Sequence, residues 1–250
     1  WPGNPTPRIA ETYGGMLNSV GLQNPGADSF IAEDIPFVRQ YDTKLIVNLA
    51  GHSIEEYCRV AEKITQADVD LLELNISCPN IKEGGVAFGT NPAMAEAVVR
   101  EVKKVVTKPL IVKLSPNVTD ITEIAKAAEA GGADALSLIN TLFGMRIDVY
   151  KRRPVLAQKM GGFSGPAVKP VAVRMVYQVH KATSLPIVAM GGVSSGEDVA
   201  EFIMAGATMV ATGTLNLVEP DCPVRILAEL EAFMDQTGVS DIQEIRGIID

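Results

Sequence analysis

The most constraining feature of this chain is a repeated alternation of short apolar runs with longer amphipathic stretches. The apolar runs are rich in Val, Ile and Leu and have the length of single strands. This alternation predicts repeated βα units around a parallel sheet. The predicted strands cover residues 16–22, 44–49, 71–76, 110–114, 135–139, 187–190 and 209–211. The predicted helices cover residues 53–65, 91–106, 118–130, 166–182, 195–205 and 222–236.

Seven strands of this kind are one short of an α/β barrel of the (β/α)8 TIM type. The last predicted strand is followed by a closing helix, so the first barrel strand is expected to precede Trp1 and to be absent from this chain. An open, doubly wound sheet of seven strands is the alternative. Polar residues recur at the carboxyl ends of nearly every predicted strand, where barrel enzymes place their sites, and this favours the barrel.

Composition narrows the class of protein further. The 250 residues are 47% hydrophobic and contain no linker-like tract, which predicts a single domain over residues 1–250. A net charge of −8 argues against nucleic acid or an anionic membrane as a partner. No apolar run reaches the roughly 18 residues of a membrane span. The three cysteines are far apart, which disfavours disulfides and metal clusters and predicts a cytoplasmic protein with no metal site.

Cys78 is the strongest candidate for a catalytic residue. It lies in the segment Asn-Ile-Ser-Cys-Pro-Asn (residues 75–80), directly after an apolar run, so a thiol and two amides are expected where a strand ends. Residues 81–90 are rich in glycine without apolar periodicity, which predicts a mobile loop that closes over a substrate. Alternatively, Cys78 is a small buried packing residue. Cys58 and Cys222 lack polar neighbours and are predicted to be inert.

Polar side chains also mark the ends of other predicted strands. Lys113 lies in an apolar strand, where a lysine needs an anionic or hydrogen-bonding partner. That partner is either a ligand or Glu73, with which it would form a structural ion pair. Amide and hydroxyl side chains at equivalent positions are Asn48, Asn75, Asn140 and Thr141. Because the carboxyl ends of parallel strands share one edge, these residues are expected to form one site.

Two glycine turns follow the last two predicted strands. Gly191 and Gly192 precede the helix start at Ser195, and Gly213 with Thr214 follows the next strand. Bare glycines let backbone N–H groups approach an anion, and a helix N-terminus favours negative charge. Successive turns of this kind after the seventh and eighth strands are typical of a barrel phosphate site. The sequence therefore predicts phosphate binding.

These motifs, taken in order, resemble the dihydroorotate dehydrogenases, specifically the class 1B catalytic subunit. The resemblance rests on residues 15–26, 75–80, 139–141, 144–148 and 161–166. It implies that FMN is bound by Asn48, Asn75, Lys113, Ile139, Gly165, Gly191, Gly192, Gly213 and Thr214. It implies that dihydroorotate is bound by Asn18, Ser19, Val20, Gly21, Leu22, Asn75, Asn140 and Thr141. Further contacts that the family makes from an N-terminal segment have no positions in this chain.

The resemblance also implies the chemistry and the partners. Cys78 would remove the C5 proton of dihydroorotate while a hydride passes from C6 to FMN, giving orotate for pyrimidine (UMP) biosynthesis. A homodimer core would assemble with a subunit carrying FAD and a [2Fe–2S] cluster into a heterotetramer that passes electrons to NAD⁺; fumarate is the alternative acceptor. One competing interpretation is a dihydropyrimidine dehydrogenase-like FMN barrel, whose loop resembles Ser-Cys-Pro-His where this chain has Asn80. The other is a non-catalytic phosphate-binding barrel.

Overall fold

The computed structural model describes residues 1–77 and 88–249, and the chain divides into two compact units. Unit 1 consists of Trp1–Gly3 and Gly21–Ser137, and unit 2 consists of Asn4–Val20 and Leu138–Asp250. Cys78 and residues 81–87 of the predicted loop lie outside the described residues. The prediction of a single domain stays a prediction.

Unit 1 is built on parallel strands in the order β3-β4-β5-β6. The strands are β3 (Ile46–Leu49), β4 (Leu71–Asn75), β5 (Leu110–Lys113) and β6 (Ala135–Leu138). The helices that connect them are α3 (Ile54–Thr65), α4 (Pro92–Val105) and α5 (Ile121–Ala130). Leucines of the central strands, such as Leu72, Leu74 and Leu110, are fully buried, as expected of a parallel sheet covered by helices.

The helices of unit 1 begin where their capping side chains predict. The Ser53 hydroxyl accepts the backbone N–H of Glu56, and the Asn91 side chain accepts that of Met94. Before β3, the chain forms three short helical segments that the sequence analysis did not predict. These are α1 (Ala27–Ser29), the π-helical η1 (Phe30–Asp34) and α2 (Ile35–Val38).

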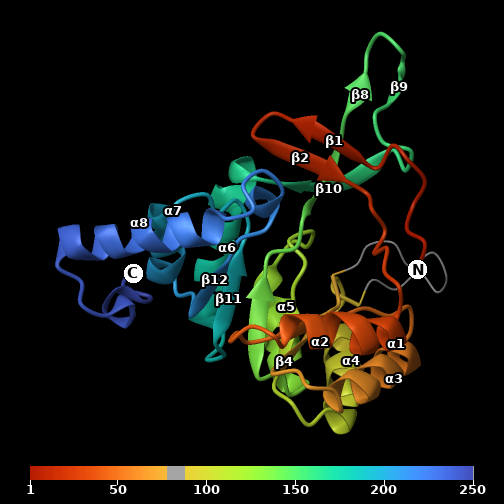
Figure 1. Ribbon diagram of the computed structural model, residues 1–250, viewed down its shortest axis with the longest axis horizontal. Helices are drawn as coiled ribbons and strands as arrows, with labels where there is room; N and C mark the ends of the chain where they lie inside the picture. The colour runs from red at the N-terminus through yellow and green to blue at the C-terminus, as the bar shows by residue number, and fades with distance from the viewer. Residues whose placement is uncertain (78–87, 250) are drawn as a thin grey trace. The chain divides into compact units, whose positions relative to one another are not determined.

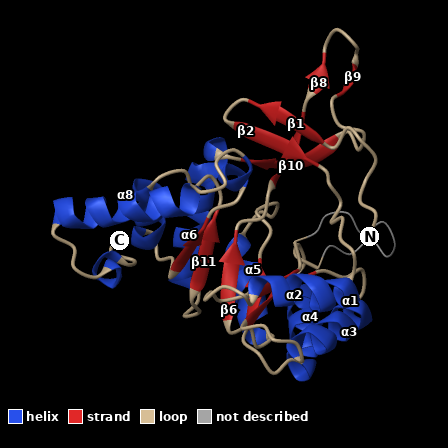
Figure 2. Ribbon diagram, in the orientation of Figure 1, coloured by secondary structure: helices blue, strands red, loops and turns tan. Residues whose placement is uncertain are grey.

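Unit 2 contains the parallel pair β11 (Ile187–Met190) and β12 (Met209–Ala211) with three longer helices (labelled in Figure 1, coloured by secondary structure in Figure 2). The helices are α6 (Lys169–Ala182), α7 (Gly196–Met204) and α8 (Cys222–Thr237). Short 3₁₀ turns are η2 (Pro166–Val168), η3 (Thr214–Leu217) and η4 (Ile242–Ile245). The predicted start of α7 is confirmed, because Ser195 and Asp198 form a complete capping box.

Unit 2 also carries an antiparallel sheet in the order β1-β2-β10-β7, which corrects one prediction. Its strands are β1 (Ile9–Thr12), β2 (Gly15–Asn18), β7 (Leu142–Met145) and β10 (Met160–Ser164), and the hairpin β8 (Ile147–Asp148)–β9 (Arg153–Pro154) extends from it (Figure 1). Residues 16–22 were predicted as a parallel barrel strand, and this is wrong. Gly14 has a φ of 67°, which permits a tight turn, so the chain pairs back on itself as a hairpin.

The parallel strands among the described residues are therefore six, four in unit 1 and two in unit 2. Each of these six lies within one residue or two of its predicted range. The α/β class with repeated parallel βα units is confirmed. Among the described residues, no helix combines the length and the apolar character that crossing a membrane requires.

Candidate functional site

In unit 1, strand register places five polar side chains on one face of the sheet. Asn48 is paired with Glu73 across β3 and β4, Asn75 with Lys113 across β4 and β5, and Lys113 with Ser137 across β5 and β6. Paired residues on neighbouring strands project to the same side, and residues two apart on one strand do so as well. The three predicted FMN ligands of this unit, Asn48, Asn75 and Lys113, are thus brought together.

Glu73 is the centre of this polar cluster. One of its carboxylate oxygens accepts a hydrogen bond of 2.6 Å from the Ser137 hydroxyl, and the other accepts one from the Asn48 amide. The Lys113 ammonium lies 3.7 Å from the second oxygen. Glu73 is 9% exposed, so these contacts supply the partners that a buried carboxylate needs. The ion pair considered as the alternative for Lys113 is present.

The Lys113 side chain remains 19% exposed beside this ion pair. An ammonium carries three donors, so Lys113 can pair with Glu73 and still meet a ligand. Ser137 was missed by the sequence analysis. Its signal was a hydroxyl within a predicted apolar strand, at the level of Lys113 on the neighbouring strand.

Asn75 is fixed on both sides by hydrogen bonds. Its backbone carbonyl accepts the Tyr57 hydroxyl at 2.7 Å. Its side-chain oxygen accepts the backbone N–H and the hydroxyl of Ser77 at 3.2 and 2.6 Å, which leaves its NH₂ group directed toward the Asn48 oxygen at 3.5 Å. The orientation of this amide is therefore set where the chain leads to Cys78.

The predicted substrate residues divide between the two units. Gly21 and Leu22 belong to unit 1 and have positive φ angles of 78° and 54°. Residues 18–20 belong to unit 2, where Asn4 donates its backbone and side-chain N–H groups to Val20 and Ser19 carbonyls at 2.9 Å. The buried Ser19 hydroxyl has no hydrogen-bond partner among the described residues. An orphaned buried hydroxyl is costly, and a polar ligand would satisfy it.

Asn140 and Thr141 are the other substrate residues predicted in unit 2. The Asn140 side-chain oxygen accepts the Thr141 backbone N–H at 2.8 Å. Gly162 on β10 lies directly against Thr141, since a Cβ at Gly162 would come within 2.1 Å of the threonine hydroxyl. The glycine is thus required for the close approach of β10 to this pair.

The predicted phosphate residues of unit 2 also come together. A Cβ on Gly192 would lie 2.9 Å from the Gly165 carbonyl oxygen, so the chain after β10 and the chain after β11 touch through bare backbone. The Thr214 hydroxyl donates to the Ser164 hydroxyl at 2.8 Å, which joins the end of β12 to the end of β10. Gly165, Gly191 and Gly192 have φ angles of 114°, 128° and 81°, which residues other than glycine rarely adopt.

Ile139 and Gly213 complete this glycine cluster. A Cβ on Gly191 would lie 3.2 Å from a side-chain carbon of Ile139, and the Ile139 N–H donates to the Met190 carbonyl at 3.0 Å. Around Gly213, no described atom lies within 4 Å of where a Cβ would be, so its backbone has an open side. In this cluster Gly213 is exposed, Gly191 and Gly192 are half-buried, and Gly165 is buried. Backbone N–H groups of such glycines are the kind of donor that binds an anion.

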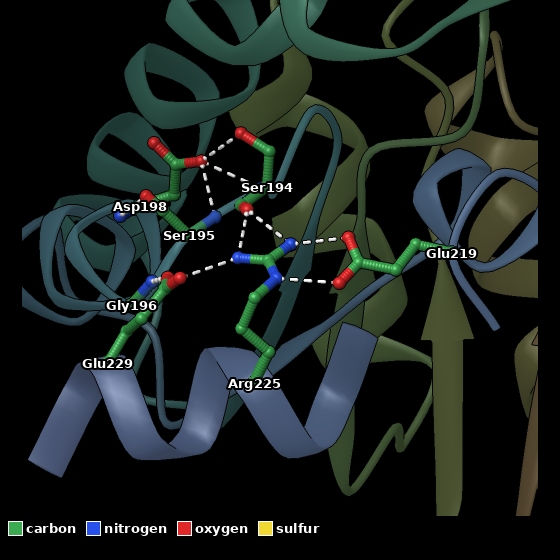
Figure 3. Close-up of polar contacts among 7 residues, drawn as sticks. All are labelled: Ser194, Ser195, Gly196, Asp198, Glu219, Arg225 and Glu229. Atoms are coloured by element: carbon green, nitrogen blue, oxygen red, sulfur yellow. Dashed lines mark hydrogen bonds and ion pairs between the residues drawn. The ribbon is translucent and has the colours of Figure 1, made fainter. Parts of the chain in front are cut away.

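The backbone N–H groups at the N-terminus of α7 donate to carboxylate side chains, and the part of this helix end in phosphate binding stays a prediction. Asp198 accepts the backbone N–H groups of Ser194 and Ser195 at 2.7 and 3.1 Å, and Glu229 accepts that of Gly196 at 2.9 Å (Figure 3). Burial alone would raise the pKa of Asp198, but hydrogen bonds from Lys169 and Ser194 outweigh it and hold this pKa below its usual value. Because these N–H groups already donate to carboxylates, the glycines are the better candidates for binding an anion.

The inert roles of the two described cysteines stay predictions, although Cys222 does have a polar neighbour. Cys222 is buried, and its thiol lies 3.1 Å from the Asn216 side-chain oxygen. Burial, together with the nearby Glu101, raises the pKa of the Cys58 thiol above its usual value. A raised pKa lowers the fraction of reactive thiolate.

Comparison with known proteins assigns the family. The family model described as dihydroorotate dehydrogenase matches residues 1–234. The "Dihydroorotate dehydrogenase B (NAD(+)), catalytic subunit" of Alkaliphilus metalliredigens is 64% identical over 247 residues, which are 99% of this chain and 82% of that protein. Proteins of the same name from Lachnoclostridium phytofermentans and Geobacillus kaustophilus are 60% and 56% identical, over 100% and 98% of this chain and 83% and 79% of their own.

Proposed function

Because the chain belongs to the dihydroorotate dehydrogenase family, we propose that it oxidises dihydroorotate to orotate in pyrimidine biosynthesis, with NAD⁺ as the electron acceptor. The observation that carries this proposal is identity of 54 to 64% with relatives named dihydroorotate dehydrogenase B (NAD(+)), catalytic subunit, across nearly the whole chain. The proposal includes a single FMN-binding domain over residues 1–250 and a cytoplasmic location.

Each unit, taken by itself, contains residues of the kinds that bind part of FMN. In unit 1, Asn48, Asn75 and Lys113 share one face, and they would hold the polar edge of the flavin ring with amide and ammonium donors. In unit 2, the glycine cluster would hold the phosphate. The residues of this cluster are Ile139, Gly165, Gly191, Gly192, Gly213 and Thr214. Bound FMN would supply the acceptor for the substrate hydride.

Residues 18–22, Asn75, Asn140 and Thr141 would hold dihydroorotate. The orphaned Ser19 hydroxyl supports this role, because a substrate carboxylate or carbonyl would give it the partner it lacks. The fixed amide of Asn75 supports it too, since a pre-oriented donor loses little entropy on binding.

Cys78 would act as the general base that takes the C5 proton. The support is its place in the sequence, three residues after Asn75 and one after Ser77, whose hydrogen bonds fix the chain that leads to it. A cysteine with an ordinary pKa of about 8.5 is only a small fraction thiolate at neutral pH, so the reaction should speed up as the pH rises toward that value.

The relatives' names as catalytic subunits support an assembly with a second kind of subunit. We extend the proposal to a homodimer core that joins a subunit carrying FAD and a [2Fe–2S] cluster, which would relay electrons to NAD⁺. Sizing the chain alone and after co-expression with that subunit tests this extension. A mass equal to two copies of each subunit is expected for the complex.

The experiment that tests the function is flavin bleaching. The purified chain should carry a yellow flavin that dihydroorotate bleaches without oxygen and that an acceptor restores. Bleaching by dihydrouracil in place of dihydroorotate would indicate a dihydropyrimidine dehydrogenase-like enzyme. A chain that binds no flavin, even when FMN is supplied, would be a phosphate-binding barrel at most and would refute the proposal.

A further inference from the structure

Arg225, on α8, reaches the Ser194 carbonyl in the chain that follows β11 (Figure 3). Its Nε and Nη2 atoms donate to the two carboxylate oxygens of Glu219, each at 2.7 Å, and its Nη1 donates to Glu229 at 2.7 Å. Both Nη atoms also lie 3.3 Å from the Ser194 carbonyl oxygen. A guanidinium carries five donors in a planar fork and can hold these four acceptor oxygens at once, whereas an ammonium carries only three donors.

The backbone around Ser194 is fixed on every side by these contacts. Arg225 holds its carbonyl, and Asp198 holds its N–H and its hydroxyl, each at 2.7 Å. Glu229 connects Arg225 to the start of α7, because one of its carboxylate oxygens accepts from Arg225 and the other accepts from the Gly196 N–H. That hydrogen bond from Gly196, together with Arg225, also holds the pKa of Glu229 below its usual value, so this carboxylate is charged at neutral pH.

The stretch between this anchored backbone and β11 consists of Gly191, Gly192 and Val193. Two glycines with positive φ have wide conformational freedom, so the direction of their N–H groups is decided by what holds the ends of the turn. Strand β11 holds one end. The Ser194–Gly196 backbone, held by Arg225, Asp198 and Glu229, holds the other.

We propose that Arg225 is a positioning residue for phosphate binding: through the Ser194 carbonyl, it holds Gly191 and Gly192 in the conformation that receives the phosphate of FMN. The inference rests on the proposed function, because it takes those glycines as the phosphate ligands. Arg225 itself touches no phosphate in this arrangement, since its donors are committed to Glu219, Glu229 and Ser194. Its effect is on the backbone that makes the contact.

A structural role confined to anchoring α8 is the competing explanation, and riboflavin separates the two. Riboflavin has the flavin ring of FMN and lacks the phosphate. If Arg225 acts through the phosphate, Arg225→Met should weaken FMN binding by roughly tenfold, the order expected for loss of a hydrogen bond to a charged group, and leave riboflavin binding unchanged. Affinities are measured by the quenching of flavin fluorescence on titration into the flavin-free full chain.

Two variants complete the experiment. Arg225→Lys keeps the positive charge and loses the guanidinium fork, so it should also weaken FMN binding and leave riboflavin binding unchanged. This variant decides the question if Arg225→Met does not fold. Arg174→Met is the matched control, because Arg174 is exposed on α6 of the same unit and its hydrogen bond is to Gln178. It should change neither affinity.

Four results would overturn the proposal. Unchanged FMN affinity in the folded Arg225 variants shows that the turn needs no support from Arg225. An equal loss of FMN and riboflavin affinity shows a structural role alone. A wild-type chain that binds both flavins equally tightly shows that the glycine turn does not serve the phosphate, while flavin binding itself stands; a wild-type chain that binds neither refutes the proposed function and the role of Arg225 together.

Discussion

Glu73→Gln should destabilise the flavin-free protein, because Glu73 is the anion on which the unit 1 cluster depends. The amide has the same shape as the carboxylate and can still meet both neighbours. Its NH₂ group can donate to the Ser137 hydroxyl, and its oxygen can accept from Asn48. What disappears is the negative charge opposite Lys113. The perturbation therefore leaves no cavity; it removes the charge and turns the Ser137 hydroxyl from a donor into an acceptor.

The magnitude follows from the contacts of Glu73. Two hydrogen bonds to a charged acceptor become neutral ones, at a cost of about 1 kcal/mol each. Unit charges 4 Å apart attract by about 4 kcal/mol at an effective dielectric constant near 20, but the desolvation of both groups offsets most of this. The 3.7 Å separation from Lys113 and the partial exposure of both side chains reduce it further. We expect the free energy of unfolding to fall by about 2 to 3 kcal/mol.

Urea unfolding at pH 7 measures this change, with an unchanged slope as the sign that only stability has altered. Glu101→Gln is the matched control, because Glu101 pairs with Lys104 on the surface of α4, where ion pairs contribute little. The double variant Glu73→Gln/Lys113→Met removes the unpaired charge as well, so it should lose less than the sum of its two single variants. A Glu73→Gln midpoint equal to that of the control, or strict additivity in the double variant, would refute the electrostatic account.

Three further predictions concern the site and its surroundings. Cys78→Ala should keep its flavin and slow the reduction of that flavin by dihydroorotate about 10² to 10⁴-fold in rapid mixing, and a wild-type rate with an unchanged pH profile would make Cys78 a packing residue. Lys113→Met should raise the dissociation constant of FMN, and an unchanged constant in the fluorescence titration would contradict its role. The Leu45 N–H and Arg39 hold the pKa of Asp70 below its usual value, so Asp70 stabilises the fold above pH of about 4 and this contribution is lost as the pH falls. Asp70→Asn should therefore show a smaller drop in urea midpoint between pH 7 and pH 3 than the wild type, and an equal drop would count against it.

The parallel strands and their helices could be predicted from the sequence because local signals coincide there. Apolar runs such as 110–114 can be buried on both faces only in a parallel sheet, and Ser53 and Ser195 cap the helices they precede. The antiparallel sheet could not be predicted in the same way. Strand β10 reads Met-Gly-Gly-Phe-Ser, whose glycines serve close packing against neighbouring strands and carry no alternation of polarity.

The site shows the same division between local and long-range information. Asn48, Asn75 and Lys113 could be identified because each stands out within its own strand. The partners of Glu73 could not, since Ser137 is 64 residues away in the sequence and meets it only through the register of three strands. Arg225 could not be identified either. Its proposed role depends on the Ser194 carbonyl, 31 residues earlier. Every residue has a backbone carbonyl, so the residue type does not show which carbonyl accepts a hydrogen bond.

Variants of Glu73 and Arg225 should respond to FMN in opposite ways when the urea midpoint of each is compared with that of the wild type. Glu73 is the described anion opposite Lys113, so it would share the positive charge of that ammonium with an electron-rich flavin edge. Removing its charge costs stability in the flavin-free protein, but it leaves Lys113 to the flavin alone, so FMN should raise the urea midpoint of Glu73→Gln by more than it raises that of the wild type. Arg225 supports the glycine turn and competes with nothing, so FMN should raise the midpoint of Arg225→Met by less. A common response of both variants to FMN would mean that neither residue acts on the flavin as the structure indicates.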